Sequence, residues 1–77
     1  PRNIAGVEVA MMFKPSMEKE TVKISFRSRR LNVSELAQSM GGGGHARAAG
    51  CTLKGNIVDV KPRVMTRVLA ALREAEF

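Results

Sequence analysis

The stretch LNVSELAQSMGGGGHARAAG, residues Leu31–Gly50, decides how this chain of 77 residues folds. Its first half predicts a short helix. Asn32 is a good N-cap residue, and Glu35 stands three residues later to complete a capping box. Gly41 then ends the helix in the manner of a C′ glycine. Between these ends, apolar residues follow the spacing of a buried helical stripe: Val33, Leu36, Ala37 and Met40.

The next glycines, Gly42, Gly43 and Gly44, need a further reason, because ordering a glycine on folding costs more entropy than ordering an alanine. Without Cβ atoms, a bound group can approach the backbone closely, and successive N–H groups can converge on an anion. The following HARAA predicts one helical turn, whose N-terminus would add N–H donors beside His45. The run Gly41 to His45 therefore predicts a phosphate-binding loop, with a flexible glycine hinge as the alternative.

Two alternating segments precede this stretch. AGVEVAMMF predicts a half-buried strand, which Pro15 and the polar run KPSMEKE end. TVKISFRS predicts a second strand, and its polar face holds Ser25 and Arg27. Two alternating strands joined by a short loop most simply form an antiparallel hairpin. The apolar faces are predicted to consist of Val7, Val9, Met11 and Phe13 in the first strand and Val22, Ile24 and Phe26 in the second.

After the glycines, CTLKG predicts a short strand, and a long helix follows from about Asp59, which we interpret as its cap. Pro62 is tolerable only in the first turn of that helix. The fold class is therefore α/β: a small mixed sheet with a β-hairpin, a Gly-rich loop after a short helix, and a long C-terminal helix covering the sheet. The length allows one domain, residues 1–77. The start at Pro1 indicates a fragment of a longer protein or a processed product.

The charge distribution points to an anionic partner. The net charge is +6, and the segment 21–58 holds six basic residues and one acidic residue, Glu35, so it accounts for +5 of that total. Such an excess favours nucleic acid or phosphate, with a solvated basic face as the alternative. Arg27 lies at the end of the second strand, where its guanidinium can pair with phosphate and Ser28 can add a hydroxyl donor. Other basic residues are auxiliary candidates: Arg29, Arg30 and Arg47.

Several function classes are excluded or disfavoured. One His and one Asp are too few ligands for a metal-assisted hydrolase, and His45 with Cys51 lacks a third catalytic group. The chain has no Trp or Tyr, so it offers few aromatic rings on which bases could stack. Binding should therefore rest on phosphate and sugar contacts. The single cysteine forms no internal disulfide and fits a reducing cytoplasm. No apolar run approaches the length of a membrane span.

Together these motifs resemble a known family. VKISFRSRRLNVSELAQSMGGGGHARAAGCTLKG is similar to the C-terminal DHH-associated (DHHA-type) domain of DHH-family phosphoesterases, through S-x-R-S, N-V-x-x-L-A, G-G-G-G-H and A-A-G in order. The branch that it resembles most contains the nanoRNases and 3′-phosphoadenosine 5′-phosphate phosphatases. The resemblance covers about residues 5 to 76 and implies that this is the substrate-binding domain of a longer phosphoesterase.

The resemblance also implies a division of labour. A separate DHH catalytic domain would hold manganese and perform the hydrolysis, so this chain alone would contain no catalytic residue, no metal ligand and no cofactor. The associated domain would close over a short RNA or nucleotide. Arg27 and Ser28 would meet phosphate, the backbone of Gly41, Gly42, Gly43 and Gly44 would cradle the substrate, and His45 would contact phosphate near the metals. Ser25 is a further auxiliary candidate.

Three functions stay open from the sequence. The chain is a domain of a short-RNA exonuclease or nucleotide phosphatase, a domain of a cyclic dinucleotide phosphodiesterase, or an autonomous RNA- or single-strand-binding module. A blander alternative is a structural or dimerisation domain whose glycines only allow close packing. We expect a cytoplasmic protein without a membrane partner, and the sequence leaves its oligomeric state and preferred substrate open.

Overall fold

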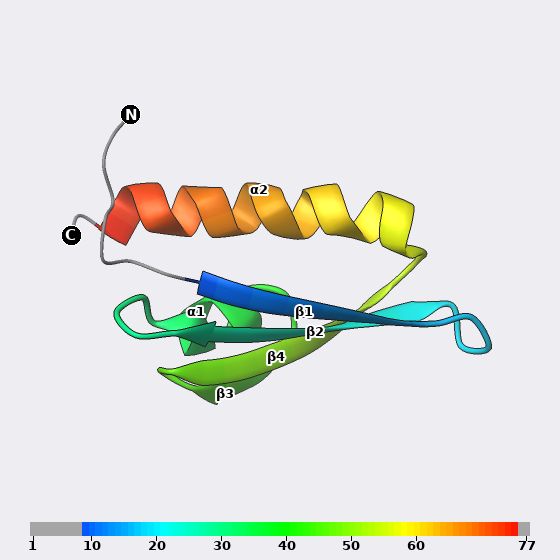
Figure 1. Ribbon diagram of the computed structural model, residues 1–77, viewed down its shortest axis with the longest axis horizontal. Helices are drawn as coiled ribbons and strands as arrows, with labels where there is room; N and C mark the ends of the chain where they lie inside the picture. Colours follow the sequence, from blue (N-terminus) through cyan, green and yellow to red (C-terminus); the bar gives the residue numbers. More distant parts are fainter. Residues whose placement is uncertain (1–8, 76–77) are drawn as a thin grey trace.

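The computed structural model describes residues 9–75, which form one four-stranded sheet and two helices (Figure 1). Along the chain these are β1 (Val9–Ser16), β2 (Thr21–Ser28), α1 (Val33–Gln38), β3 (Gly43–His45), β4 (Ala48–Lys54) and α2 (Ile57–Ala75). The strand order is β1-β2-β4-β3, and every neighbouring pair is antiparallel. The expected α/β class with a hairpin, a short helix and a long C-terminal helix is confirmed, although the sheet is antiparallel throughout rather than mixed.

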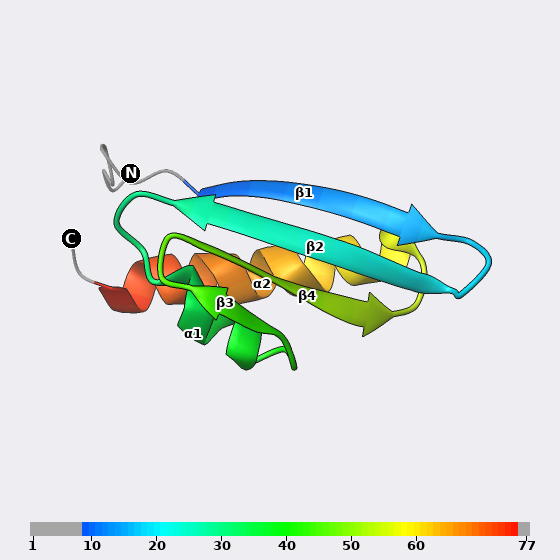
Figure 2. The ribbon, with the colours of Figure 1, turned by 90° about the horizontal axis from the view of Figure 1, so that it is seen from below.

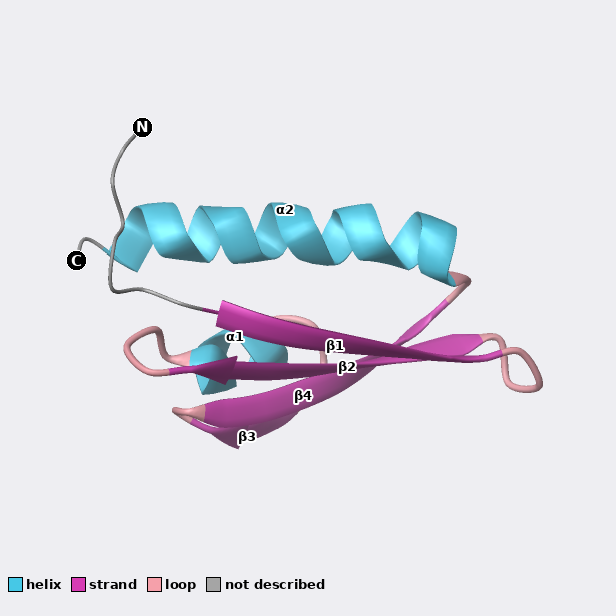
Figure 3. Ribbon diagram, in the orientation of Figure 1, coloured by secondary structure: helices cyan, strands magenta, loops and turns pink. Residues whose placement is uncertain are grey.

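Both helices pack on the same face of the sheet. In Figures 1 and 3, α2 runs along one side of the sheet and α1 lies beside β4 and β3. Seen from the other side, in Figure 2, the sheet lies in front of α2, and no described element covers this second face. We call this second face the open face. The molecule therefore has a helix-covered face, which holds the core, and an open face that no element of residues 9–75 covers.

The core is made of the alternate residues that the sequence pattern predicts. Val22, Ile24 and Phe26 on β2 are at most 1 % exposed. Burial of such apolar side chains is the main stabilising contribution in a domain of this size. From α2, every fourth residue reaches the same cluster, and α1 and β4 complete it: Val60, Val64, Val68, Val33, Leu36, Ala37 and Cys51.

The hairpin of β1 and β2 confirms the predicted alternation, with one correction. Met11 pairs with Phe26 and Phe13 with Ile24 on the core face, while Val7 lies outside the described residues. We expected Pro15 to end the first strand, but β1 continues to Ser16. This is possible because β1 is an edge strand, where a missing N–H need not cost a ladder hydrogen bond.

Helix α1 has the N-cap residue and the terminal glycine that the sequence predicts. Asn32 Oδ1 accepts the backbone N–H groups of Ser34 and Glu35, at 3.0 and 3.2 Å. At the other end Gly41 has a φ of +86°, its N–H donates to Gln38 O, and the N–H of Gly42 donates to Ala37 O at 2.8 Å. This pair of bonds is a Schellman motif, which satisfies carbonyls that the helix end leaves unpaired.

The predicted helical turn over HARAA is wrong. His45 belongs to β3, Ala46 and Arg47 form a tight turn, and Ala48 begins β4. This turn is fixed to the connection between β2 and α1, because Val33 N–H donates to Ala46 O at 3.0 Å and Ser28 N–H donates to Arg47 O at 3.1 Å. His45 therefore begins no helix of its own, although Ala46, the next residue, accepts a hydrogen bond from the first N–H of α1.

Helix α2 starts two residues before the expected Asp59. Asn56 is its cap, since Asn56 Oδ1 accepts the N–H of Asp59 at 2.9 Å, and Asp59 lies in the first turn. Pro62 lies inside the helix, beyond the first turn in which we expected it. The missing proline N–H leaves the carbonyl of Val58 without its helical donor, and Val58 is 77 % exposed, so water can reach this part of the helix.

Candidate functional site

The open face is defined by the alternate residues that point away from the helices. The four strands contain no Asp or Glu, so their basic side chains are not neutralised within the sheet. Every basic residue of the strands is exposed and lies on the open face by its register position: Lys14, Lys23, Arg27 and Lys54. The open face is therefore positively charged, as an anion-binding surface should be.

Arg27 and His45 lie in the same row across this face. Arg27 pairs with Ala48, and Ala48 pairs with His45, so the two functional candidates flank a single small residue. Directly opposed residues of antiparallel strands point to the same face. Two strand spacings separate their Cα atoms, about 10 Å, and both side chains are exposed. A phosphate above Ala48 would lie between a guanidinium and an imidazole.

The neighbouring row is almost free of side chains. It contains Ser25, Gly50 and Gly43 in register, so Ser25 lies beside Gly50, and Gly43 lies one strand further. A Cβ built on Gly43 meets nothing within 4 Å. The fold therefore does not require a glycine at this position, and its absent side chain leaves the open face flat next to His45.

The other three glycines of the run have structural reasons. Gly41 needs its positive φ at the helix end. A Cβ on Gly42 would come within 2.1 Å of Gly50 O, and a Cβ on Gly44 within 2.5 Å of Ala49 Cα. These two glycines therefore allow β3, and the residue that precedes it, to lie close to β4. The N–H groups of Gly41 and Gly42 already donate to α1 carbonyls. The run thus serves the packing of β3 as well as any ligand.

Ser28 lies on the other side of β2 from Arg27. Its side chain is 8 % exposed, and its Oγ accepts the N–H of Leu31 at 2.9 Å and that of Arg30 at 3.3 Å. The hydroxyl therefore holds the turn that leads into α1. The structure does not bring it together with His45 and Gly43.

Arg29 and Arg47 do lie near Arg27. A hollow of about 300 Å³ is lined by Ala10, Arg27, Ser28, Arg29 and Arg47. Nη1 of Arg47 donates to Arg29 O, which links the β3–β4 turn to the end of β2. Three arginines line this one hollow, so the positive surface extends beyond the row of Arg27 and His45.

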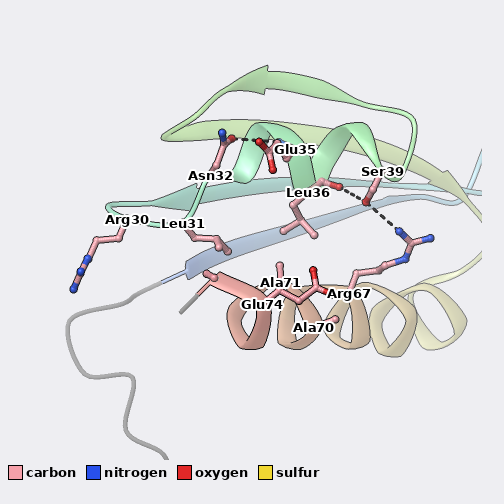
Figure 4. Close-up of a pocket in the computed structure, with 11 residues that line it drawn as sticks. Arg30, Leu31, Asn32, Glu35, Leu36, Ser39, Arg67, Ala70, Ala71 and Glu74 are labelled. Carbon is pink, nitrogen blue, oxygen red and sulfur yellow. Dashed lines mark hydrogen bonds between the residues drawn. The ribbon is translucent and has the colours of Figure 1, made fainter. Parts of the chain in front are cut away.

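Arg30 lies elsewhere. It lines a groove of about 590 Å³ between α1 and α2, with Leu31, Leu36 and Glu74 among its other lining residues (Figure 4). In this groove Arg67 Nη1 donates to Ser39 Oγ at 3.1 Å, and Ser39 Oγ donates to Leu36 O at 2.7 Å. These bonds hold the two helices together on the helix-covered side. The groove is separate from the row of Arg27 and His45.

The structure separates the two residues that the sequence analysis considered for nucleophilic catalysis. Cys51 faces the core and is 6 % exposed, whereas His45 is exposed on the open face. Burial raises the pKa of the Cys51 thiol, which disfavours the reactive thiolate. Within residues 9–75, no three or more His, Cys, Asp or Glu side chains gather in a way that could hold a metal ion. None of the helices in that range is long and apolar enough to cross a membrane.

Two residues of β1 on the open face, Met12 and Lys14, were not among the candidates named from the sequence. Met12, 66 % exposed, and Lys14 come from β1, and Lys23 comes from β2. Lys14 pairs directly with Lys23, and Met12 pairs with Ser25. The alternation of TVKISFRS already placed Lys23 on the face of Ser25 and Arg27. In β1 the same alternation would have placed Met12 and Lys14 on the outward face, opposite the inward residues Met11 and Phe13.

Comparison with known proteins gives the family. The model of the DHHA1 domain matches residues 1–75 of the chain. The chain is also 40 % identical, over 74 residues, to the bifunctional oligoribonuclease and PAP phosphatase NrnA of Thermus thermophilus. That match covers 95 % of this chain and 21 % of the relative, so the chain spans about a fifth of the relative's length. On these two matches, the chain belongs to the DHHA1 domain family.

Proposed function

We propose that this chain is the substrate-binding domain of a DHH-family phosphoesterase that acts on short RNA or on phosphate-bearing nucleotides. The observation that carries the proposal is the row of Arg27, Ala48 and His45 on the open face. Two donors to phosphate flank a small residue, so an anion can approach the sheet between them. The similarity to an oligoribonuclease and PAP phosphatase supports this substrate class.

In this proposal the chain recognises the substrate and a separate domain performs the chemistry. Arg27 pairs with a phosphate in bidentate geometry, and His45 donates a hydrogen bond to the same group or to its neighbour. Gly43 lets the sugar–phosphate backbone lie against β3. Ser28 contributes by holding the turn at the end of β2, and Arg29 and Arg47 extend the positive field. Phe26 is buried at 1 % exposure, so it offers no stacking surface.

The catalytic metal belongs to the other domain. A DHH domain would supply its ligands and the attacking water, and manganese is the metal that the family resemblance implies. Closure of this chain over the substrate would exclude bulk water and fix the phosphate for attack.

The test is a titration of the chain with a dinucleotide of RNA, followed by amide NMR at two salt concentrations. We expect salt-sensitive shifts at Arg27, Gly43 and His45, and a large loss of affinity in Arg27→Ala. The salt slope of log K should fall by about 0.7 when one phosphate contact is lost. Arg63→Ala on α2 is the matched control, because Arg63 is exposed on the helix-covered side.

Equal binding by Arg27→Ala and the native chain would overturn the proposal. The same substitution in a protein that joins this domain to a DHH domain should lower turnover of short RNA while leaving the fold intact. Tight, length-independent binding by the 77-residue chain alone would instead favour an autonomous single-strand-binding module.

A further inference from the structure

The open face continues well beyond Arg27, and its far end carries a second group of cations. Lys14 on β1 and Lys23 on β2 are direct partners across the sheet. Lys54 on β4 pairs with Thr21, so it lies diagonally across from Lys23 on the same face. All three side chains are exposed. We call these three residues the lysine cluster.

Two members of the lysine cluster, Lys14 and Lys23, repel each other across the sheet. Like charges directly opposite each other in a sheet are destabilising, and the strands contain no acidic residue that could compensate them. Protection of a sheet edge explains a lysine on β1, which is an edge strand. It does not explain Lys23 and Lys54, because β2 and β4 are the inner strands. Like charges that the strands do not neutralise, two of them on inner strands that need no edge protection, point to an anionic ligand.

The spacing identifies what kind of anion can use both groups. Arg27 and Lys23 are four residues apart on one strand, which is about 13 Å at the usual rise of a β-strand. One nucleoside joins the two phosphates of a nucleoside bisphosphate, so they lie closer together than this. The sugar–phosphate backbone of an oligonucleotide can span the distance. The row between the two groups is uncharged and offers Met12, Ser25, Gly50 and Gly43 to sugars and bases.

We propose that the open face is a track for a short RNA strand, with one phosphate held by Arg27 and His45 and a more distant phosphate held by the lysine cluster. The track runs along β2, flanked by β1 and β4. It rests on the proposed function and deepens it, because it makes this domain select oligonucleotides of several residues over mononucleotides and dinucleotides.

The experiment compares a dinucleotide with a pentanucleotide of RNA, each titrated into the native chain and into Lys14→Gln/Lys23→Gln. This variant removes a repulsive pair of exposed charges, so it should fold at least as well as the native chain. Arg63→Gln/Arg73→Gln removes the same charge from exposed positions on α2 and is the matched control. Affinities and salt slopes are read from amide shifts and fluorescence anisotropy.

In the native chain, the pentanucleotide should bind several-fold more tightly than the dinucleotide. The lysine variant should lose that advantage and leave dinucleotide affinity within twofold. Its salt slope for the pentanucleotide should fall by about 0.7 for each phosphate contact removed. Amide shifts should appear at Lys23 and Thr52 with the pentanucleotide only.

The other outcomes contradict either the track alone or the track together with the proposed function. Equal losses for both ligands, or equal losses in the control variant, would show a general charge effect and overturn the track. No loss of pentanucleotide affinity would overturn it as well. If the track is overturned in either way, a loss of dinucleotide binding in Arg27→Ala would still support the proposed function. If Arg27→Ala binds the dinucleotide normally, or if neither ligand shifts any amide at millimolar concentration, the proposed function fails together with the track.

Discussion

Gly42, Gly43 and Gly44 are neighbours in sequence but have different surroundings. A Cβ would collide with backbone atoms of β4 at Gly42 and Gly44, and Gly44 also has a φ of +146°. At Gly43 the same Cβ would stand in open space, on the face of the sheet that holds His45. The fold accounts for Gly42 and Gly44, and it does not by itself require the glycine at position 43.

Alanine substitutions should separate these roles. Gly42→Ala and Gly44→Ala should each lower the free energy of unfolding by about 1–3 kcal/mol, because the backbone or β4 must move. Gly43→Ala should leave stability unchanged or raise it by about 0.4–1 kcal/mol, because it reduces the entropy of the unfolded chain. Urea unfolding measures these changes. Gly43→Ala should nevertheless weaken RNA binding, and normal affinity in this variant would argue against a ligand lying on β3.

At the level of elements, the connection from β2 to α1 positions both Arg29 and the β3–β4 turn. The N–H of Leu31, in a residue only 6 % exposed, donates to Ser28 Oγ at 2.9 Å. Ser28 N–H in turn donates to Arg47 O. One buried serine therefore links the end of β2, the start of α1 and the turn after β3.

Two serines of β2 should respond in opposite ways to alanine. Ser28→Ala leaves the Leu31 N–H unpaired and should lower stability by about 1–3 kcal/mol, with little change in RNA affinity of the folded protein. Ser25→Ala, on the open face, should leave stability nearly unchanged and weaken RNA binding. Thermal unfolding and NMR titration of both variants make the comparison. If Ser28→Ala keeps its stability but loses RNA binding, Ser28 contacts phosphate directly, as the motif implies.

The sequence predicted the elements whose side chains carry a pattern. Alternation indicated β1 and β2, and the cap and stripe indicated α1. Strand β3 was missed because Gly43 and Gly44 have no side chains to alternate, and because the alanines after His45 favour a helix locally. Only the non-local pairing of β3 with β4 decides its conformation. The family resemblance named Arg27 and His45 together, but their common row could not be predicted, because it exists only through the register of β3.

At the scale of the whole molecule, the sheet divides the chain into two chemically different sides. Within residues 9–75, the acidic side chains belong to helices and to the β1–β2 turn, whereas the strands carry only basic charges. The helix-covered side holds the buried apolar side chains of the core. This division lets one thin layer of sheet carry a binding surface on one side without disturbing the packing on the other.

The reactivity of Cys51 measures how often the core opens to solvent, because this residue faces the core from β4. Burial raises the pKa of its thiol above the usual value. An alkylating reagent should therefore modify the native chain only through opening of the core, at a rate that rises with urea in parallel with unfolding. Rapid, urea-independent labelling at neutral pH would show that the core is accessible in the native state.

The same thiol predicts a pH dependence of stability. The unfolded chain ionises its cysteine at a lower pH than the native chain, so above about pH 8.5 the unfolded state binds fewer protons. Stability should therefore fall as the pH rises from about 8.5, and the thiol should have no effect below that range. Cys51→Ala removes the titrating group and is the control. The urea midpoint, compared at pH 7.5 and 9.5, should fall further in the native chain than in this variant, and equal decreases would mean that the thiol ionises freely in the folded core.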